Sequence, residues 1–150
     1  MLDGLFVTPA VTAINEALVS AAITEGPIVV VGNAKLATAL GEGREVIVVG
    51  LSARAAKKLT NALVDTGTIA GRSCAAVVGI DVTDDDAWET TVRAWSRCVR
   101  DGGAIVFVDK GHAEEASRRA LCAGLSEIEQ RHAGRTVVTS GLVTHMNNRE

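Results

Sequence analysis

Four aliphatic runs stand out in the sequence, and none of them alternates with polar residues. They occupy residues 28–31, 46–49, 74–80 and 104–108, and each is followed at once by a glycine or an aspartate. Strands buried on both faces have such unbroken runs, because neither face meets water. The pattern therefore predicts four buried strands of a parallel sheet.

The segments between these runs carry apolar residues at helical spacing. We expect helices over about 9–24, 35–40, 52–65 and 113–123, and another in which Trp88, Val92, Trp95 and Val99 share one face. Residues 68–70 form a weak edge-strand candidate, and the tail from 125 to 146 has the pattern of a hairpin.

Polar residues, prolines and glycines mark the expected ends of these helices. Thr8 is the expected N-cap of the first helix, with Pro9 in its first turn. Asp84 or Asp85 is expected to cap the helix that carries the two tryptophans, and Gly102-Gly103 to stop it. A turn at Ala133-Gly134 is expected to join the two strands of the tail.

Strands and helices that alternate in this way form an α/β fold with a doubly wound, mostly parallel sheet. The tail adds a C-terminal antiparallel hairpin, and we expect one domain over residues 1–150. The strand at 28–32 should lie between those at 46–50 and 76–80, with Val30, Val48, Val78 and Val106 buried. Ligands of such folds bind beyond the carboxyl ends of the strands.

Composition and charge narrow the function classes. The formal net charge of −3 argues against a nucleic-acid partner, which requires a basic surface. No apolar run reaches the ~20 residues of a membrane span, and the N-terminus has no basic segment typical of a secretory signal. We therefore expect a cytoplasmic protein with no membrane partner. The three cysteines form no C-x-x-C pair, so we expect buried or half-buried thiols and neither a disulfide framework nor a metal site.

Several motifs resemble those of class I S-adenosylmethionine (SAM) methyltransferases. Residues 91–110, TVRAWSRCVRDGGAIVFVDK, resemble the family's helix, Gly-Gly turn and strand with a final acidic residue, here Asp109; Asp101 stands where the family usually has proline. Gly50-Leu51-Ser52 resembles the family's "Asp-Leu-Ser" after strand two, and 123–125 resembles the "Ala-Gly-Phe" before its last hairpin. The resemblance extends from about residue 27 and implies a Rossmann-like methyltransferase fold.

The same resemblance locates a cofactor site whose motifs are degenerate. If a ligand binds in the crevice, the resemblance places it against Gly32, Asn33, Gly50, Leu51, Ser52 and Asp81. Active members carry an acidic residue and a Gly-x-Gly-x-Gly loop after strand one, where this chain retains a single glycine. They also carry an acid that binds the ribose hydroxyls, where this chain has Gly50. Such a contact contributes roughly 1.5–3 kcal/mol, so we expect no cofactor bound in the family's manner.

Two residues at the predicted strand ends are weak catalytic candidates. Asp81 could act as a base or a metal ligand, although acids that follow it are typical of a helix N-terminus. His112 could act as a general base, although a surface position in a glycine-containing loop explains it equally simply. His132 and His145 have no ligand partners at metal-binding spacing, and we assign them no role.

Two functions remain open. We favour a non-catalytic methyltransferase-fold module, a pseudoenzyme that binds a protein partner or a small molecule; the alternative is a small active SAM-dependent methyltransferase with an unusual cofactor loop. The apolar composition further suggests a homo-oligomer or an obligate protein partner. The candidate contact surfaces are the first helix, with Val11, Ile14 and Leu18, and the hairpin near Val137, Val138 and Val143.

Overall fold

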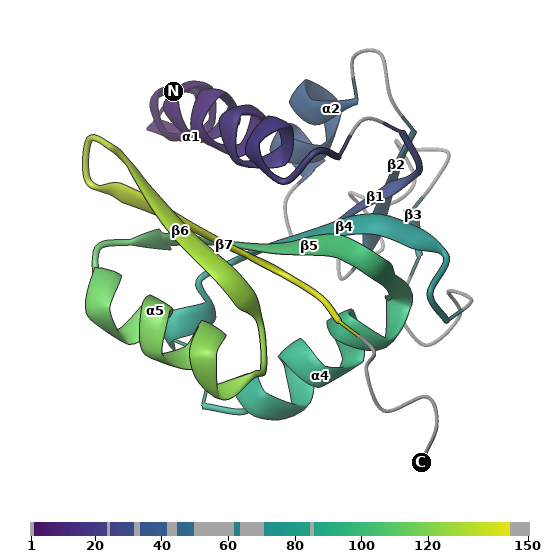
Figure 1. Cartoon of the computed structure of the whole chain (residues 1–150). Helices are drawn as coiled ribbons and strands as arrows, with labels where there is room; N and C mark the ends of the chain where they lie inside the picture. The colour runs from purple at the N-terminus through teal and green to yellow at the C-terminus, as the bar shows by residue number, and fades with distance from the viewer. Residues whose placement is uncertain are drawn as a thin grey trace.

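A computed structural model describes residues 2–23, 25–31, 34–41, 45–49, 62–63, 71–84 and 86–144. Helices and strands follow one another along most of this part of the chain (Figure 1). The elements in chain order are α1 (Leu2–Ser20), β1 (Ile28–Val31), α2 (Ala34–Leu40), β2 (Val46–Val49), β3 (Ala62–Leu63), β4 (Cys74–Ile80), the 3-10 helix η2 (Val82–Asp84), α4 (Trp88–Cys98), β5 (Val99–Lys110), α5 (Ala113–Cys122), β6 (Ser126–Ala133) and β7 (Thr136–Leu142).

The seven strands form one sheet in the order β3-β2-β1-β4-β5-β7-β6. The first five are parallel, whereas β7 runs antiparallel to β5 and to β6. β1 lies between β2 and β4, as the sequence predicts. The doubly wound, mostly parallel sheet with its C-terminal hairpin is confirmed.

Helices cover both faces of the sheet, with α1 and α2 on one face and α4 and α5 on the other (Figure 1). Alternate residues of each strand point to opposite faces, so each strand contributes to two cores. Val30, Val78 and Val106 belong to the core under α1 and α2, whereas neighbours such as Val29 and Ile105 belong to the core over α4 and α5. The predicted burial of Val30, Val48, Val78 and Val106 is confirmed, because none is more than 3% exposed.

Gly79 of β4 lies directly under the indole ring of Trp95 in α4. A Cβ atom at Gly79 would come within 2.6 and 2.8 Å of Cζ3 and Cζ2 of that ring. The ring also meets Phe107 edge-on, with the ring centres 6.4 Å apart. The missing side chain of Gly79 therefore lets α4 approach the sheet closely.

The predicted start of the first helix is wrong. α1 begins at Leu2 and passes through Pro9, so Thr8 is not its N-cap. Leu2 and Leu5 continue the helical apolar spacing on the other side of the proline. A proline inside a helix removes one backbone hydrogen bond, and α1 continues on both sides of Pro9.

The predicted ends of the tryptophan-bearing helix are also wrong. Its N-cap residue is Ala87, which makes no side-chain hydrogen bond to the helix, so Asp84 is not the N-cap; Asp85 lies outside the described residues. Val99 already has extended backbone, so the helix ends before Gly102-Gly103. The two glycines lie in β5, where the register with β4 shifts between Cys74 and Ala76. A Cβ at Gly103 would lie 2.5 Å from the carbonyl oxygen of Ala75, so the glycine permits a close approach of two backbones.

Residues 52–65 were expected to form a helix, but Ala62–Leu63 form a short strand parallel to β2. Pairing with the exposed edge of β2 overrides the helical spacing there. The remainder of the predicted helix and the strand candidate at 68–70 lie outside the described residues.

The two surfaces expected to form oligomer contacts are covered within the chain itself. Ile14, Leu18, Val137, Val138 and Val143 are all at most 3% exposed, because α1 and the hairpin pack on the sheet, and Val11 is partly buried against the same core. The edge strand β6 instead presents glutamates, an arginine and a histidine, residues that discourage pairing with another chain. The expectation of apolar contact patches at these residues is therefore wrong.

The three cysteines lie in different surroundings. Cys74 and Cys98 are buried as expected, and burial raises the pKa of the Cys74 thiol. Cys122 is exposed, contrary to the expectation of a buried or half-buried thiol. None of the described helices is long and apolar enough to cross a membrane.

Candidate functional site

The carboxyl ends of the parallel strands define the edge of the sheet where a ligand would bind. β4 ends at Ile80 and β5 at Lys110, and these strands are neighbours. β7 runs the other way, so its first residue, Thr136, pairs with Lys110 at this same edge. The edge therefore combines the segment after β4, the segment after β5 and the turn between β6 and β7.

Asp81 and His112, the two catalytic candidates, lie at this edge. Asp81 directly follows β4, and His112 follows the end of β5 after one intervening residue. Both side chains are exposed, and both residues have a left-handed backbone, with φ of 57° at Asp81 and 61° at His112. The amide of Asp81 donates to the carbonyl of Val108, which holds the turn against β5. His112 is the N-cap residue of α5 and makes no side-chain hydrogen bond to the helix.

The other predicted cofactor positions cannot be placed in the same way. Gly32, Asn33, Gly50, Leu51 and Ser52 lie outside the described residues. The strand residues that precede them are described. Val31 is paired with Val49 on one side and with Gly79 on the other, so this part of the edge is apolar.

Asp109 has a positioning role at this edge that the sequence analysis did not assign. Its side chain is buried, with 1% exposed, and its Oδ1 accepts hydrogen bonds from the backbone N of Thr83 at 2.9 Å and from Thr83 Oγ1 at 3.0 Å. The carboxylate thereby fixes η2 to the end of β5. A charged residue that follows an unbroken aliphatic run was the sequence signal for such a role.

Arg119 fixes η2 from the other side. Its Nη1 donates to the carbonyl oxygen of Val82 at 2.6 Å, and its Nε donates to Glu115 Oε2 at 2.6 Å. Its guanidinium also lies over the ring of Trp88, 5.2 Å from the ring centre. Hydrogen bonds from Arg118 and then Arg119 lower the pKa of Glu115 from 4.5 to about 2, so this carboxylate stays charged and keeps the arginine in place.

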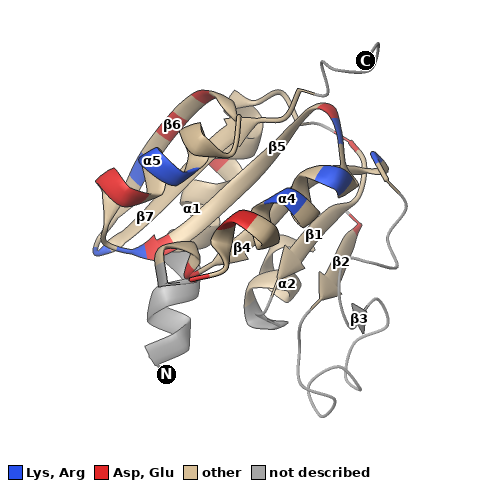
Figure 2. Cartoon of the chain, turned by 90° about the horizontal axis from the view of Figure 1, so that it is seen from below, with Lys and Arg blue, Asp and Glu red and all other residues tan. Residues whose placement is uncertain are grey.

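A basic hollow opens at the same edge, lined by Lys110, His112, His132, Arg135 and Thr136 among others. Charged residues of both signs lie where β5 ends and β7 begins (Figure 2). The hollow also faces the start of α5, and helix N-termini attract anions. The arrangement suits a negatively charged group, and His112 is in position to contact such a group.

Sequence reasoning missed the hairpin's contribution to this hollow. His132 was assigned no role, and Arg135 and Thr136 were not considered, because they lie more than twenty positions beyond Lys110. Only the register that pairs Lys110 with Thr136 brings them together.

The fold and the position of this edge define the class of protein, a class I methyltransferase-like α/β domain. No family model and no curated protein matches the sequence. Solved structures of methyltransferases have the same fold as this chain. Their sequences are only 13–15% identical to it, so the similarity concerns the fold and not the activity.

Three compact structures illustrate the similarity. A chain in the complex of the Haloferax volcanii Trm112 methyltransferase activator with a methyltransferase has a TM-score of 0.70 and 14% identity, over 89% of each chain. A SAM-dependent methyltransferase from Thermotoga maritima has a TM-score of 0.68 and 15% identity, again over 89% of each chain. A SAM-dependent methyltransferase from Methanococcus maripaludis has a TM-score of 0.67 and 13% identity, over 93% of this chain and 86% of the other.

Proposed function

We propose that this chain is a non-catalytic methyltransferase-fold module that acts by binding a protein or a small molecule. The observation that carries the proposal is Gly50, which stands directly after β2 where active members have the acid that binds ribose. A glycine has no side chain to make that charge-assisted hydrogen bond. The single Gly32 in place of a glycine-rich loop supports the same conclusion.

The described part of the carboxyl edge supports this proposal. Val31, Val49 and Gly79 lie side by side near the ends of β1, β2 and β4 and offer no acidic side chain. Asp109 is an acid at this edge, but its Oδ1 already accepts two hydrogen bonds from Thr83. Its carboxylate is therefore engaged in holding the fold.

Calorimetric titration with SAM and with S-adenosylhomocysteine tests the proposal. We expect a Kd weaker than about 100 μM, because losing an acidic contact lowers affinity by one to two decades. Adenosine serves as a matched control for binding of the nucleoside alone. A low-micromolar Kd for SAM would overturn the proposal.

The alternative is a small active SAM-dependent methyltransferase. It is favoured by the extent of the structural match, since the three compact methyltransferases are covered over 86–89% of their length. Transfer of a labelled methyl group from SAM to an acceptor, lost in Asp81→Asn and His112→Ala but retained in Glu25→Gln, an exposed residue before β1 at the opposite edge, would establish this alternative. Absence of cofactor binding in the titration excludes it.

We also propose that the module works with a partner, either another protein or a second copy of itself. The similar Haloferax volcanii structure contains a methyltransferase activator, which supports an arrangement of this kind. We further propose that residues 1–150 form a single domain and that the protein is located in the cytoplasm.

A further inference from the structure

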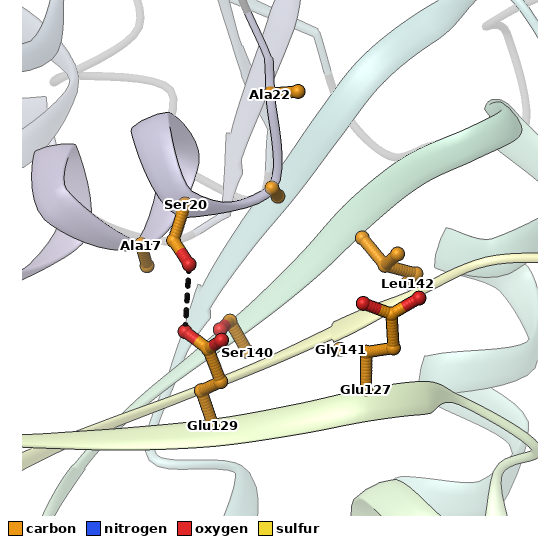
Figure 3. Close-up of a pocket in the computed structure, with 9 residues that line it drawn as sticks. Ala17, Ser20, Ala22, Glu127, Glu129, Ser140, Gly141 and Leu142 are labelled. Atoms are coloured by element: carbon orange, nitrogen blue, oxygen red, sulfur yellow. Dashed lines mark hydrogen bonds between the residues drawn. The ribbon is translucent and has the colours of Figure 1, made fainter.

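A second hollow lies on the opposite side of the hairpin, between the end of α1 and strands β6 and β7 (Figure 3). We call it the α1–hairpin pocket; it has a volume of about 240 Å³. Its lining residues are Ala17, Ser20, Ala21, Ala22, Glu127, Glu129, Ser140, Gly141 and Leu142. Gly141 and Leu142 pair with the beginning of the aliphatic part of β5, whereas the basic hollow lies where β7 begins. The two hollows share no lining residue and lie toward opposite ends of β7, so they form separate sites.

Two carboxylates face this pocket from β6. Glu129 accepts a hydrogen bond from Ser20 Oγ at 2.9 Å and from Arg131 Nη1 at 3.0 Å. These bonds, in that order, lower the pKa of Glu129, which keeps it charged. Glu127 has neither a hydrogen bond nor an ion pair with its side chain within the part of the chain that the structure describes. Its backbone is left-handed, with φ of 51°, at the register shift between Ser126 and Glu129.

A buried hydroxyl completes the polar lining. Ser140 is only 6% exposed, and its Oγ makes no hydrogen bond to any described residue. Figure 3 shows this side chain beside the Glu129 carboxylate, on the wall of the pocket. Among the described residues, Ser140 Oγ is not one of the fully buried atoms that lack a partner, so the hydroxyl is open to the pocket, where a ligand can donate a hydrogen bond to it.

The remaining lining sets the size and character of that ligand. Ala17, Ala21 and Leu142 add apolar surface to the lining of the pocket. Within the described residues, no group of three or more metal-ligating His, Cys, Asp or Glu side chains occurs, and the Arg131 guanidinium beside Glu129 opposes a divalent cation. A monovalent cation with a short carbon chain matches both the charged and the apolar walls.

We propose that the α1–hairpin pocket binds a small primary ammonium ion. The ammonium group lies between Glu127 and Glu129 and donates a hydrogen bond to Ser140 Oγ, and its carbon chain lies against Ala17 and Leu142. The site goes beyond the proposed function and is independent of it, because it lies at the other end of β7 from the carboxyl edge.

Titration of the full chain with n-butylammonium, followed by amide chemical shifts in NMR, tests this site. We expect saturable shifts at Ala17, Ala21 and Gly141, and none at these amides with 1-butanol, which has the same shape without the charge. Glu127→Gln and Ser140→Ala should each weaken binding by about ten-fold or more, the effect of losing one hydrogen bond to a charged group. Glu114→Gln, the same change of charge on the exposed face of α5, should leave the affinity unchanged.

Several results would overturn the site. These are no saturable shifts with n-butylammonium, shifts centred elsewhere, equal weakening by Glu127→Gln and Glu114→Gln, or tighter binding of Ca²⁺ at the same amides. Ser140→Ala removes a hydroxyl that makes no hydrogen bond to a described residue, so we expect the variant to fold. The dispersion of its amide signals in the NMR spectrum checks this. The SAM titration is a separate measurement on other residues, so failure of either proposal leaves the other intact.

Discussion

The contact between Gly79 and Trp95 leads to a quantitative prediction for Gly79→Ala. The new methyl group would overlap the outer ring of the indole, Cη2 most closely, and the ring would have to retreat by more than about 1 Å to reach an ordinary contact distance. Trp95 is only 5% exposed and also packs edge-on against Phe107, so the ring has no free space behind it. Overpacking of this kind costs about 1–3 kcal/mol.

A smaller effect opposes this cost. Alanine in a strand is favoured over glycine by roughly 0.5–1 kcal/mol, because glycine loses more backbone freedom on folding. The net expectation is a loss of about 1–2 kcal/mol in the free energy of unfolding. For a chain of this length that corresponds to a Tm lower by roughly 2–8 °C.

Urea denaturation of four proteins decides the matter: the parent, Gly79→Ala, Trp95→Phe and the double variant. Phenylalanine lacks the outer ring, so Gly79→Ala should be neutral or stabilising in the Trp95→Phe background. The two changes should therefore be coupled by at least about 1 kcal/mol. An equal loss in both backgrounds, or a single variant within about 0.3 kcal/mol of the parent, would refute the proposed contact.

Three further predictions concern the carboxyl edge, acid stability and assembly. Asp109→Ala should lower the free energy of unfolding by about 1–3 kcal/mol, because it loses both hydrogen bonds of Oδ1, and Thr83→Val should lower it by about 1 kcal/mol, because it loses only one. Urea denaturation measures both changes. A loss below about 0.5 kcal/mol in Asp109→Ala would contradict the role of the carboxylate. Glu115 has a pKa of about 2 in the folded chain and 4.5 as its ordinary value, so its stabilising effect is complete above pH 4.5 and is lost as the pH falls toward 2. Glu115→Gln should accordingly flatten the fall of Tm across that range, and an unchanged acid profile would count against the pair with Arg118. If the partner is a second copy, light scattering coupled to size exclusion should give a multiple of 15.6 kDa at tens of micromolar protein, whereas a mass near 15.6 kDa would rule out the homo-oligomer and leave another protein as the partner, to be tested by pull-down.

The central strands could be predicted from sequence because burial on both faces produces unbroken apolar runs. Val46–Val49 and Cys74–Ile80 have the bounds that the aliphatic runs indicated. Element ends were harder, because the glycines at 102–103 have the local chemistry of a helix stop, but Gly103 serves a close approach to the backbone of Ala75 and Gly102 has a left-handed backbone with φ of 81°. That requirement belongs to the pairing of two strands and leaves no local signal.

The candidate sites show the same limit. Asp81 and His112 were found because they follow strands, and strand ends can be read along the chain. The α1–hairpin pocket was not found, because Ser20 and Glu129 are separated by 109 positions and meet only after α1 packs on the hairpin. Residue types such as serine and glutamate carry no signal of their own at these positions.

The position of β7 between β5 and β6 has a consequence for synthesis of the chain on the ribosome. β5 contains the buried aliphatic run 104–108, and until residues 136–142 leave the exit tunnel its outer edge has no partner. β6 emerges first but cannot fill that gap, because β7 must enter between the two. The nascent chain therefore exposes a strand edge that is prone to pair with other chains. A chain that stops before the last strand would keep that edge open and would be expected to aggregate, although all five parallel strands had already been made.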